Sequence, residues 1–167
     1  LGLNVIGKTN FEFIKDFINN KSKFFVAIGD CLKRAKIQNK LHNHKASIAT
    51  LFHPNATISR YSDIGQGSLI CAGAIVGPDV KIGEGSIINH SSTVDHDSIV
   101  GRFTHICPHA SLSGNTQIGS FSTIGTGARV IPDIHVGENC LIGAGAVVNK
   151  SIPSYQKAFG VPARIIN

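Results

Sequence analysis

An aliphatic residue occupies every sixth position along most of this chain. The series begins at Ile58, ends at Val148 and never changes register. Amphipathic helices repeat their apolar positions at intervals of three and four residues and half-buried strands at intervals of two, so neither element explains the series. A strict six-residue period predicts a parallel β-helix, a stack of short strands wound around an apolar core. The aliphatic positions are Ile58, Ile64, Ile70, Val76, Ile82, Ile88, Val94, Val100, Ile106, Leu112, Ile118, Ile124, Val130, Val136, Ile142 and Val148.

Two other positions of the six-residue repeat support this interpretation. The residue after the aliphatic one is mostly glycine, and we interpret it as a corner that needs a positive φ. Asn89 and Asp95 take the same slot, and both residue types tolerate that conformation. The position two residues before the aliphatic one is mostly Ser, Ala or Thr. Residues this small would let a narrow prism close on itself. Three six-residue faces make one coil, whose strands rise ~4.8 Å, and about five coils are expected. The position after the aliphatic residue contains Gly65, Gly77, Gly83, Gly101, Gly119, Gly125, Gly137 and Gly143. The position two residues before it contains Ser68, Ala74, Ser86, Ser92, Ser98 and Ala110.

Residues before the repeat show a different pattern, that of alternating helices and strands. A helix capped by Asn10 is followed by a buried strand at residues 23–28, a helix at residues 30–41 and another strand at residues 46–51. This order predicts part of a Rossmann-like βαβ arrangement. The apolar face of the first helix contains Phe13, Ile14, Phe17 and Ile18.

The chain therefore divides into a partial Rossmann-like α/β unit at residues 1–52 and a β-helix domain with a C-terminal tail at residues 53–167, and its fold class is mainly β. The net charge of +6 lies outside the prism, because residues 58–148 carry four basic and seven acidic side chains. We interpret the basic residues around Lys33 and Arg34 as an exposed helix face and expect no nucleic-acid partner. With no leader segment and no stretch of about 20 apolar residues, we expect a cytoplasmic protein that does not contact membranes.

The four cysteines form no C-x-x-C motif. Cys71, Cys107 and Cys140 fall on positions of the repeat where small, partly buried residues are expected. We therefore expect free thiols and no bound metal.

Four segments of the chain resemble one family of bacterial enzymes. They read FFVAIGDCLKR at residues 24–34, LFHPNA at 51–56, INHSSTVDHDSIVGRFTHI at 88–106 and FGVPARII at 159–166. Together they are similar to the NeuD/PglD-type sugar acetyltransferases, a hexapeptide-repeat family that includes the sialic acid O-acetyltransferases. The resemblance implies a left-handed parallel β-helix, an exception to the usual right-handed crossover, with acetyl-CoA as co-substrate. It also implies a homotrimer with active sites between neighbouring subunits.

Acetyl transfer requires a base for the acceptor proton and a donor for the oxyanion. His96 is the expected base, because the ordinary pKa of histidine lies near neutral pH. The resemblance implies that Asp97 raises its basicity, as an adjacent anion does, whereas we interpret Asp95 as structural. Gly114 lies eighteen residues after His96, so their backbones should stack ~4.8 Å apart. Its N–H is the expected oxyanion donor, a role that the family assigns to the matching residue.

The resemblance also implies a set of binding residues. The ring N–H of His105 is expected to donate to the coenzyme, and backbone groups of three other residues to contact it. Family members usually open with a strand and a glycine-rich, histidine-containing loop, followed by an acidic pair, and these bind the nucleotide sugar; neither is found in this sequence. The coenzyme contacts fall on Gly114, Thr126 and Ala144, the acceptor-sugar contact on Asn89, and the nucleotide contacts on Gly29 and Leu32.

We therefore expect an acetyltransferase that moves acetyl from acetyl-CoA to the amine or hydroxyl of a nucleotide-activated amino sugar, by direct attack, in bacterial surface-glycan biosynthesis. A sialic acid O-acetyltransferase, a γ-carbonic-anhydrase-like metalloenzyme and a non-catalytic trimeric scaffold remain alternatives. The metalloenzymes pair two histidines five residues apart, whereas His105 and His109 are four apart. We assign no role to His90, His109 or His135, and two roles remain open for Arg164, a contact with the coenzyme phosphates and closure of the end of the prism.

Overall fold

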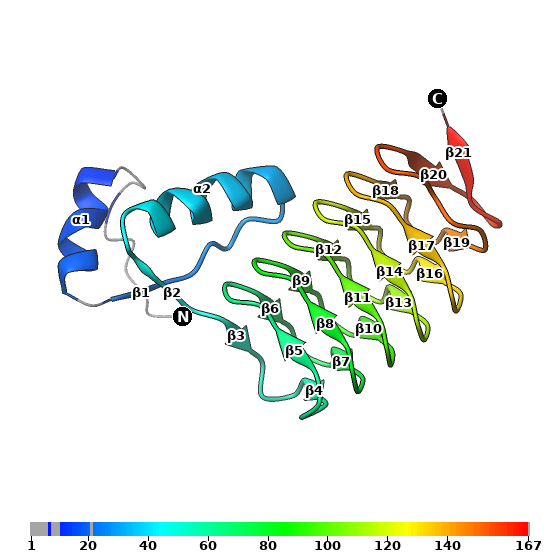
Figure 1. Cartoon of the computed structure of the whole chain (residues 1–167), viewed down its shortest axis with the longest axis horizontal. Helices are drawn as coiled ribbons and strands as arrows, with labels where there is room; N and C mark the ends of the chain where they lie inside the picture. Colours follow the sequence, from blue (N-terminus) through cyan, green and yellow to red (C-terminus); the bar gives the residue numbers. More distant parts are fainter. Residues whose placement is uncertain (1–6, 8–10, 21, 167) are drawn as a thin grey trace.

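The computed structural model describes residue 7 and residues 11–20 and 22–166, and most of this chain forms a three-sided prism of very short strands (Figure 1). The strands belong to three sheets, which we name by their number of strands. The eight-stranded sheet contains β3 (Leu51–Phe52), β6 (Leu69–Ile70), β9 (Ile87–Ile88), β12 (His105–Ile106), β15 (Thr123–Ile124), β18 (Leu141–Ile142), β20 (Lys157–Phe159) and β21 (Arg164–Ile166). The six-stranded sheet contains β4 (Thr57–Ile58), β7 (Ile75–Val76), β10 (Thr93–Val94), β13 (Ser111–Leu112), β16 (Arg129–Val130) and β19 (Val147–Val148). The five-stranded sheet contains β5 (Asp63–Ile64), β8 (Lys81–Ile82), β11 (Ile99–Val100), β14 (Gln117–Ile118) and β17 (His135–Val136).

The chain visits the three sheets in turn, so the prism has three edges. It passes from the eight-stranded to the six-stranded sheet at the first edge, on to the five-stranded sheet at the second edge, and back at the third edge. Neighbouring strands are parallel and eighteen residues apart, as in the pairing of His105 with Thr123. The predicted left-handed parallel β-helix is confirmed.

The aliphatic residues of the repeat form the core of the prism. From Ile70 to Val148 each is at most 3% exposed, because the second residue of each strand points inward. Ile58 and Ile64, in the first coil, are partly buried. The prism also extends beyond the predicted coils, since β3 pairs with β6 and β20 pairs with β18.

The prediction that glycine follows the aliphatic residue because of a positive φ is wrong. Among the described residues of the coils, positive φ values occur two positions later, for example at Asp79 and Asp97 (φ of 57° and 59°). The glycine is required instead by close stacking of successive coils. A methyl group on Gly101 would lie 2.4 Å from the backbone nitrogen of Ser120 in the next coil, which is closer than any side chain could approach.

The slot two residues before the aliphatic one faces the interior, and it is fully buried in each coil from Ser68 to Ala128, whereas Ile134 is partly buried. Along the third edge it also forms a ladder of hydrogen bonds. Ser68 Oγ donates to the carbonyl of Gly83 at 3.1 Å and accepts the N–H of Ser86 at 3.2 Å. Ser86 and Ser122 make both kinds of contact, and Thr104 donates to the carbonyl of Gly119. We call the position two residues before the aliphatic one the hydroxyl slot. Along this edge its buried hydroxyl oxygens all have hydrogen-bond partners.

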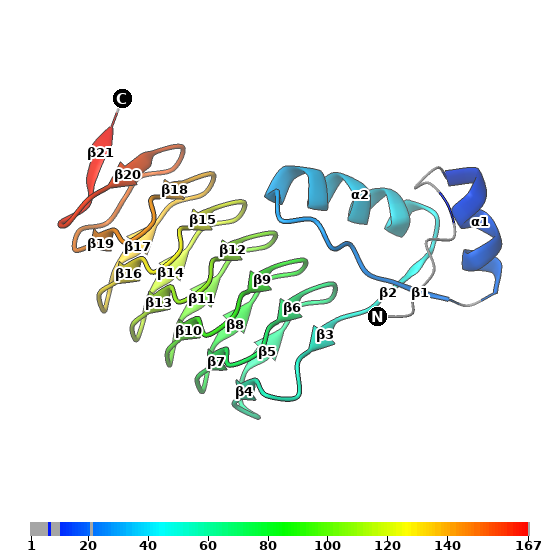
Figure 2. The ribbon, with the colours of Figure 1, turned by 180° about the vertical axis from the view of Figure 1, so that it is seen from behind.

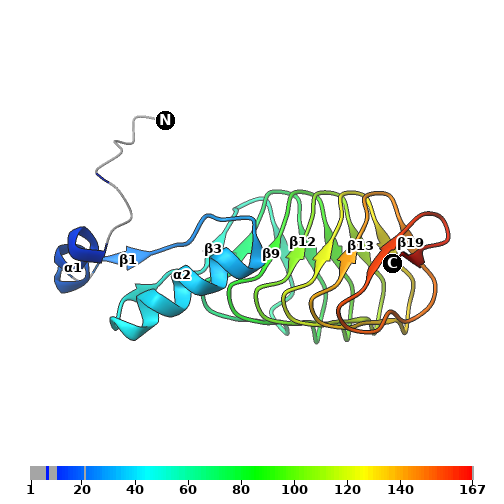
Figure 3. The same cartoon turned by 90° about the horizontal axis from the view of Figure 1, so that it is seen from above.

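The residues before the prism form a small α/β unit. It contains α1 (Phe11–Asn19), β1 (Lys23–Phe24), α2 (Cys31–Asn43) and β2 (Ser47–Ile48), and β1 and β2 are parallel, which makes a βαβ unit. The strand predicted at residues 23–28 pairs only over β1, and the one predicted at 46–51 divides into β2 and β3. Asp30 caps α2 by accepting the N–H of Lys33 at 2.8 Å. The proposed cap Asn10 lies outside the described residues. Helix α2 runs beside the first coils in two further views (Figure 2, Figure 3).

The prediction that Arg34 lies on an exposed face is wrong. Its side chain is fully buried between α2 and the third edge, where the guanidinium donates to five main-chain carbonyls at 2.6 to 3.3 Å. Burial lowers the pKa of Arg34. The carbonyls belong to Ile28 and Gly29 in the loop before α2, and to Gly85, Phe103 and Thr104 in the prism. Arg34 therefore fastens this loop to the coils.

Candidate active site

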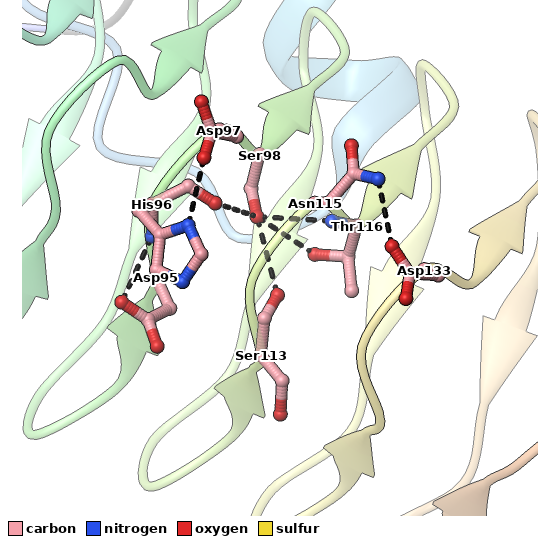
Figure 4. Close-up of polar contacts among 8 residues, drawn as sticks. All are labelled: Asp95, His96, Asp97, Ser98, Ser113, Asn115, Thr116 and Asp133. Carbon is pink, nitrogen blue, oxygen red and sulfur yellow. Dashed lines mark hydrogen bonds and ion pairs between the residues drawn. The ribbon is translucent and has the colours of Figure 1, made fainter.

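His96 stands on the second edge of the prism, in the turn between β10 and β11 (Figure 4). The left-handed backbone of Asp97 turns the chain there. Nδ1 of His96 lies 2.8 Å from Oδ2 of Asp97, and the backbone N–H of His96 donates to Oδ1 of Asp95 at 2.8 Å. Both carboxylates therefore flank the same imidazole.

The two carboxylates set the protonation of His96. The hydrogen bond with Asp97 raises the pKa of His96 most, and the negative charge of Asp95 adds to this effect. When the neutral ring donates its Nδ1 proton to Asp97, Nε2 keeps a free lone pair. The side chain is 56% exposed, so this nitrogen is accessible to a substrate. His96 has the geometry of a general base.

Gly114 lies one coil beyond His96, directly against its imidazole. The N–H of Asn115 donates to the carbonyl of His96 at 2.9 Å, which joins the two coils. A methyl group on Gly114 would lie 2.5 Å from Cε1 and 2.6 Å from Nε2 of the ring. The absence of a side chain at Gly114 is therefore what allows the imidazole to occupy its position.

The N–H of Gly114 is available to a ligand. At the equivalent place one coil earlier, the N–H of His96 is occupied by Asp95. Within the part of the chain that the structure describes, no group accepts the N–H of Gly114. A free donor thus lies beside an accessible base, which is the combination that acyl transfer to an amine or hydroxyl requires.

Shallow grooves border this edge on both sides. The groove on the six-stranded sheet has a volume of about 270 Å³ and is lined by Asp95 and Ser113, among others. The groove on the five-stranded sheet has a volume of about 360 Å³ and is lined by Asp97, among others. His96 therefore stands on a ridge that ligand groups can approach along either of the two faces that meet there.

A second cluster lies on the eight-stranded sheet and joins Asn89, His105 and Gly29. Nδ2 of Asn89 lies 3.0 Å from Nε2 of His105, and Oδ1 of Asn89 accepts the N–H of His90 at 2.8 Å. Burial lowers the pKa of His105, and the charge of Arg34 lowers it further, whereas a hydrogen bond with the backbone of Gly29 acts in the opposite direction. The ring is therefore a neutral link between the prism and the loop before α2.

The residues predicted to contact the coenzyme and the nucleotide lie in different surroundings. Nε2 of His105 already lies within hydrogen-bond distance of Asn89, so a hydrogen bond from this nitrogen to the coenzyme requires that contact to be released. Leu32, on the first turn of α2, is 64% exposed. Thr126 and Ala144 are exposed on the first edge, one coil apart, and do not share an edge with His96.

The structure thus brings His96, Asp97 and Gly114 together on one edge. The other predicted residues lie in separate places, which are the cluster of Asn89, His105 and Gly29, the exposed first turn of α2 with Leu32, and the first edge with Thr126 and Ala144. Two residues at the first group were not predicted, Ser98 and Asn115. They belong to no motif. The signal that would find them is their place in the repeat, two residues after His96 and one after Gly114.

The described residues contain no group of three or more His, Cys, Asp or Glu side chains that could hold a metal ion. Cys31, Cys71 and Cys140 are buried and Cys107 is partly buried, all as free thiols. In the described residues, no helix is long and apolar enough to cross a membrane.

Comparison with known proteins places this geometry among transferases. A family model described as bacterial transferase hexapeptide (six repeats) matches residues 61–96 and 115–150. A comparison with curated proteins found no significant match.

Several solved structures are similar over nearly the whole chain. PerB from Caulobacter crescentus, crystallised with CoA and GDP-perosamine, is 36% identical with a TM-score of 0.94, over 100% of this chain and 80% of the other. The acetyltransferase domain of PglB from Neisseria gonorrhoeae, in complex with acetyl coenzyme A, is 37% identical with a TM-score of 0.90, over 99% and 80% of the two chains. WeeI from Acinetobacter baumannii is 29% identical with a TM-score of 0.87, over 99% and 81%.

Proposed function

Because the chain belongs to the bacterial hexapeptide-repeat transferases and is an acetyl-CoA-dependent sugar acetyltransferase, we propose that it acetylates the amine of a nucleotide-activated amino sugar in bacterial surface-glycan biosynthesis. The observation that carries this proposal is that Gly114, whose N–H no described residue accepts, lies directly against the imidazole of His96. Transfer to nitrogen is favoured over transfer to oxygen by the similarity to the perosamine N-acetyltransferase from Caulobacter crescentus.

In the proposed reaction the amine attacks the thioester carbonyl directly. As the C–N bond forms, His96 Nε2 accepts a proton from the amine, and the N–H of Gly114 donates to the oxyanion. The C–S bond then breaks, and the imidazolium returns its proton to the leaving thiolate, which gives coenzyme A and the acetamido sugar. Asp97 keeps Nδ1 protonated and stabilises the imidazolium between these steps. No acyl-enzyme is required.

We propose further that the site is assembled between subunits of a homotrimer. His96 and Gly114 lie on the second edge, whereas the coenzyme residues Thr126 and Ala144 lie on the first edge. Two edges of one triangular prism face different directions, so one ligand reaches both only where two prisms pack side by side. Gly29, Leu32 and Asn89, on or beside the eight-stranded sheet, are proposed to contact the nucleotide sugar.

Coenzyme A release measures the proposed reaction. The acceptors to compare are GDP- and UDP-linked 4-amino sugars, CMP-sialic acid and free sialic acid. Release with an amino sugar alone supports the proposal, whereas release with sialic acid alone would favour the O-acetyltransferase alternative.

The His96→Ala variant tests the proposed base, and the unaltered protein tests the two remaining alternatives. We expect its turnover to fall by about 10²- to 10⁴-fold, the usual contribution of a general base. Unchanged turnover would remove His96 from the mechanism. The absence of any turnover in the unaltered protein would favour the scaffold alternative, and stoichiometric zinc in the purified protein would favour the γ-carbonic-anhydrase-like alternative.

A further inference from the structure

The peptide bond between Ser113 and Gly114 carries both the proposed oxyanion donor and a carbonyl that faces the prism interior. The oxygen of Ser113 lies 3.2 Å from Oγ of Ser98, whose side chain is fully buried. This peptide bond is trans, and in a trans peptide the carbonyl and the N–H point in opposite directions. A carbonyl that is held inward therefore turns the N–H of Gly114 outward, where a ligand can reach it.

The hydroxyl of Ser98 has several neighbours but only one proton to donate (Figure 4). It accepts the N–H of Thr116 at 3.1 Å, and it lies 3.1 Å from the hydroxyl of Thr116 and 3.3 Å from the carbonyl of His96. The carbonyl of His96 already accepts the N–H of Asn115. Along the third edge, the hydroxyl slot donates to the carbonyl fifteen residues later, which for Ser98 is Ser113. We therefore conclude that the hydroxyl of Ser98 donates its proton to the carbonyl of Ser113.

Packing does not require a hydroxyl at this place on the second edge. The same slot holds Val80 one coil before Ser98 and Ile134 two coils after it. Val80 is fully buried and packs in the apolar core, and Ile134 packs against it. An aliphatic side chain therefore suits this slot, and the hydroxyl of Ser98 is explained by its acceptor instead.

The other side of Gly114 is held as well. The carbonyl of Gly114 accepts the N–H of Asp133 at 3.2 Å, and Nδ2 of Asn115 donates to Oδ1 of Asp133 at 2.7 Å. On the side before it, the N–H of Ser113 donates to the carbonyl of Val130 at 3.0 Å. The bond from Ser98 fixes the carbonyl of the peptide between these two, and with it the direction of the Gly114 N–H. That bond also polarises the peptide, which strengthens its N–H as a donor.

We infer that Ser98 is a positioning residue, which orients the oxyanion donor of Gly114 through the carbonyl of Ser113. This inference rests on the proposed function, because it assigns Ser98 to the same reaction. Ser98 touches no substrate in this arrangement, since it is buried beneath the edge.

The test compares Ser98→Ala with Ser98→Thr and with Ser68→Ala. Ser68 occupies the hydroxyl slot on the third edge and makes the same two bonds far from His96, so it controls for the loss of a buried hydroxyl. We expect Ser98→Ala to lower kcat by about tenfold, less than the 10²- to 10³-fold cost of losing such a donor outright. KM for acetyl-CoA should change by less than about twofold, because the donor acts on the oxyanion rather than on the bound thioester. Ser98→Thr should recover most of the rate, and Ser68→Ala should keep it.

The pH profile distinguishes positioning from general damage to the edge. In Ser98→Ala the acidic limb should stay in place, since Asp97 still sets the pKa of His96. Equal losses in Ser98→Ala and Ser68→Ala, an unchanged kcat in Ser98→Ala, or a shifted limb would each overturn the inference. If His96→Ala loses activity while Ser98→Ala does not, only this inference fails. If His96→Ala keeps full activity, the proposed function and this inference fail together.

Discussion

At the scale of single residues, the carboxylate of Asp97 sets the pH at which His96 can act. The base must be unprotonated, and the hydrogen bond that its Nδ1 donates to Asp97 raises the pKa of His96. The acidic limb of the rate profile should therefore lie above the pH expected for an ordinary histidine.

The Asp97→Asn variant removes this charge. Because the pKa of His96 then falls, the acidic limb of kcat should move to lower pH. The rate on the plateau should also fall, by roughly tenfold or more, because a weaker base removes the proton and the imidazolium loses its partner. Asparagine tolerates the left-handed backbone of this position. The rate is measured between pH 5 and 9 with saturating substrates. A limb that moves to higher pH would contradict the assignment of His96.

The Gly114→Ala variant tests the contact between glycine and imidazole. Its φ lies outside the left-handed region, so alanine fits the backbone, but the methyl group displaces the ring of His96. Turnover should fall by about 10²-fold, the cost of moving a catalytic group by about 1 Å. The melting temperature should change little, since the displaced ring is exposed. Wild-type turnover would show that the ring need not lie against Gly114.

At the scale of secondary-structure elements, Arg34 is the main polar link between α2 and the prism. Its guanidinium satisfies main-chain carbonyls on both sides of the junction. In the Arg34→Met variant these buried acceptors lose their donor, and the free energy of unfolding should fall by about 3 kcal/mol. Urea unfolding measures the loss. The matched control is Lys33→Met on the exposed face of the same helix, which should change stability by less than about 0.5 kcal/mol.

The elements differ in how far the sequence predicts them. The core of the prism follows from the six-residue period, because each coil repeats the same inward position. The stacking of Gly114 on His96 followed from their eighteen-residue spacing. The predicted reason for the glycines after the aliphatic residues was wrong. Their spacing alone does not distinguish a need for positive φ from a close contact with the backbone of the next coil. The burial of Arg34 was missed, since its acceptors are main-chain carbonyls, which every residue has.

At the scale of the whole molecule, the separation of edges predicts active sites shared between protomers. One protomer would supply His96 and its neighbour the coenzyme residue Ala144. Trimers that mix His96→Ala with Ala144→Trp subunits should therefore regain activity, although each variant alone loses most of its turnover. With equal amounts and random assembly, about a quarter of the sites receive an intact half from each neighbour.

The rate of these mixed trimers is measured after co-expression, and their mass by light scattering. No recovered activity in mixed trimers would place both groups in one protomer. A monomeric mass for the unaltered protein would contradict the proposed assembly.

The C-terminal tail pairs with the last strands of the prism and so limits growth of the stack at that end. Stacked parallel strands end in unpaired N–H and carbonyl groups, which recruit further strands from other molecules. Here β20 pairs with β18, Ile152 bonds to the strand of Val136, and Gly160 and Ala163 bond to Val147, so the last strand of every sheet has a partner. Strand β21 then runs antiparallel to β20, which breaks the repeat. A fold that resembles a fragment of a fibril is thereby kept from elongating at this end.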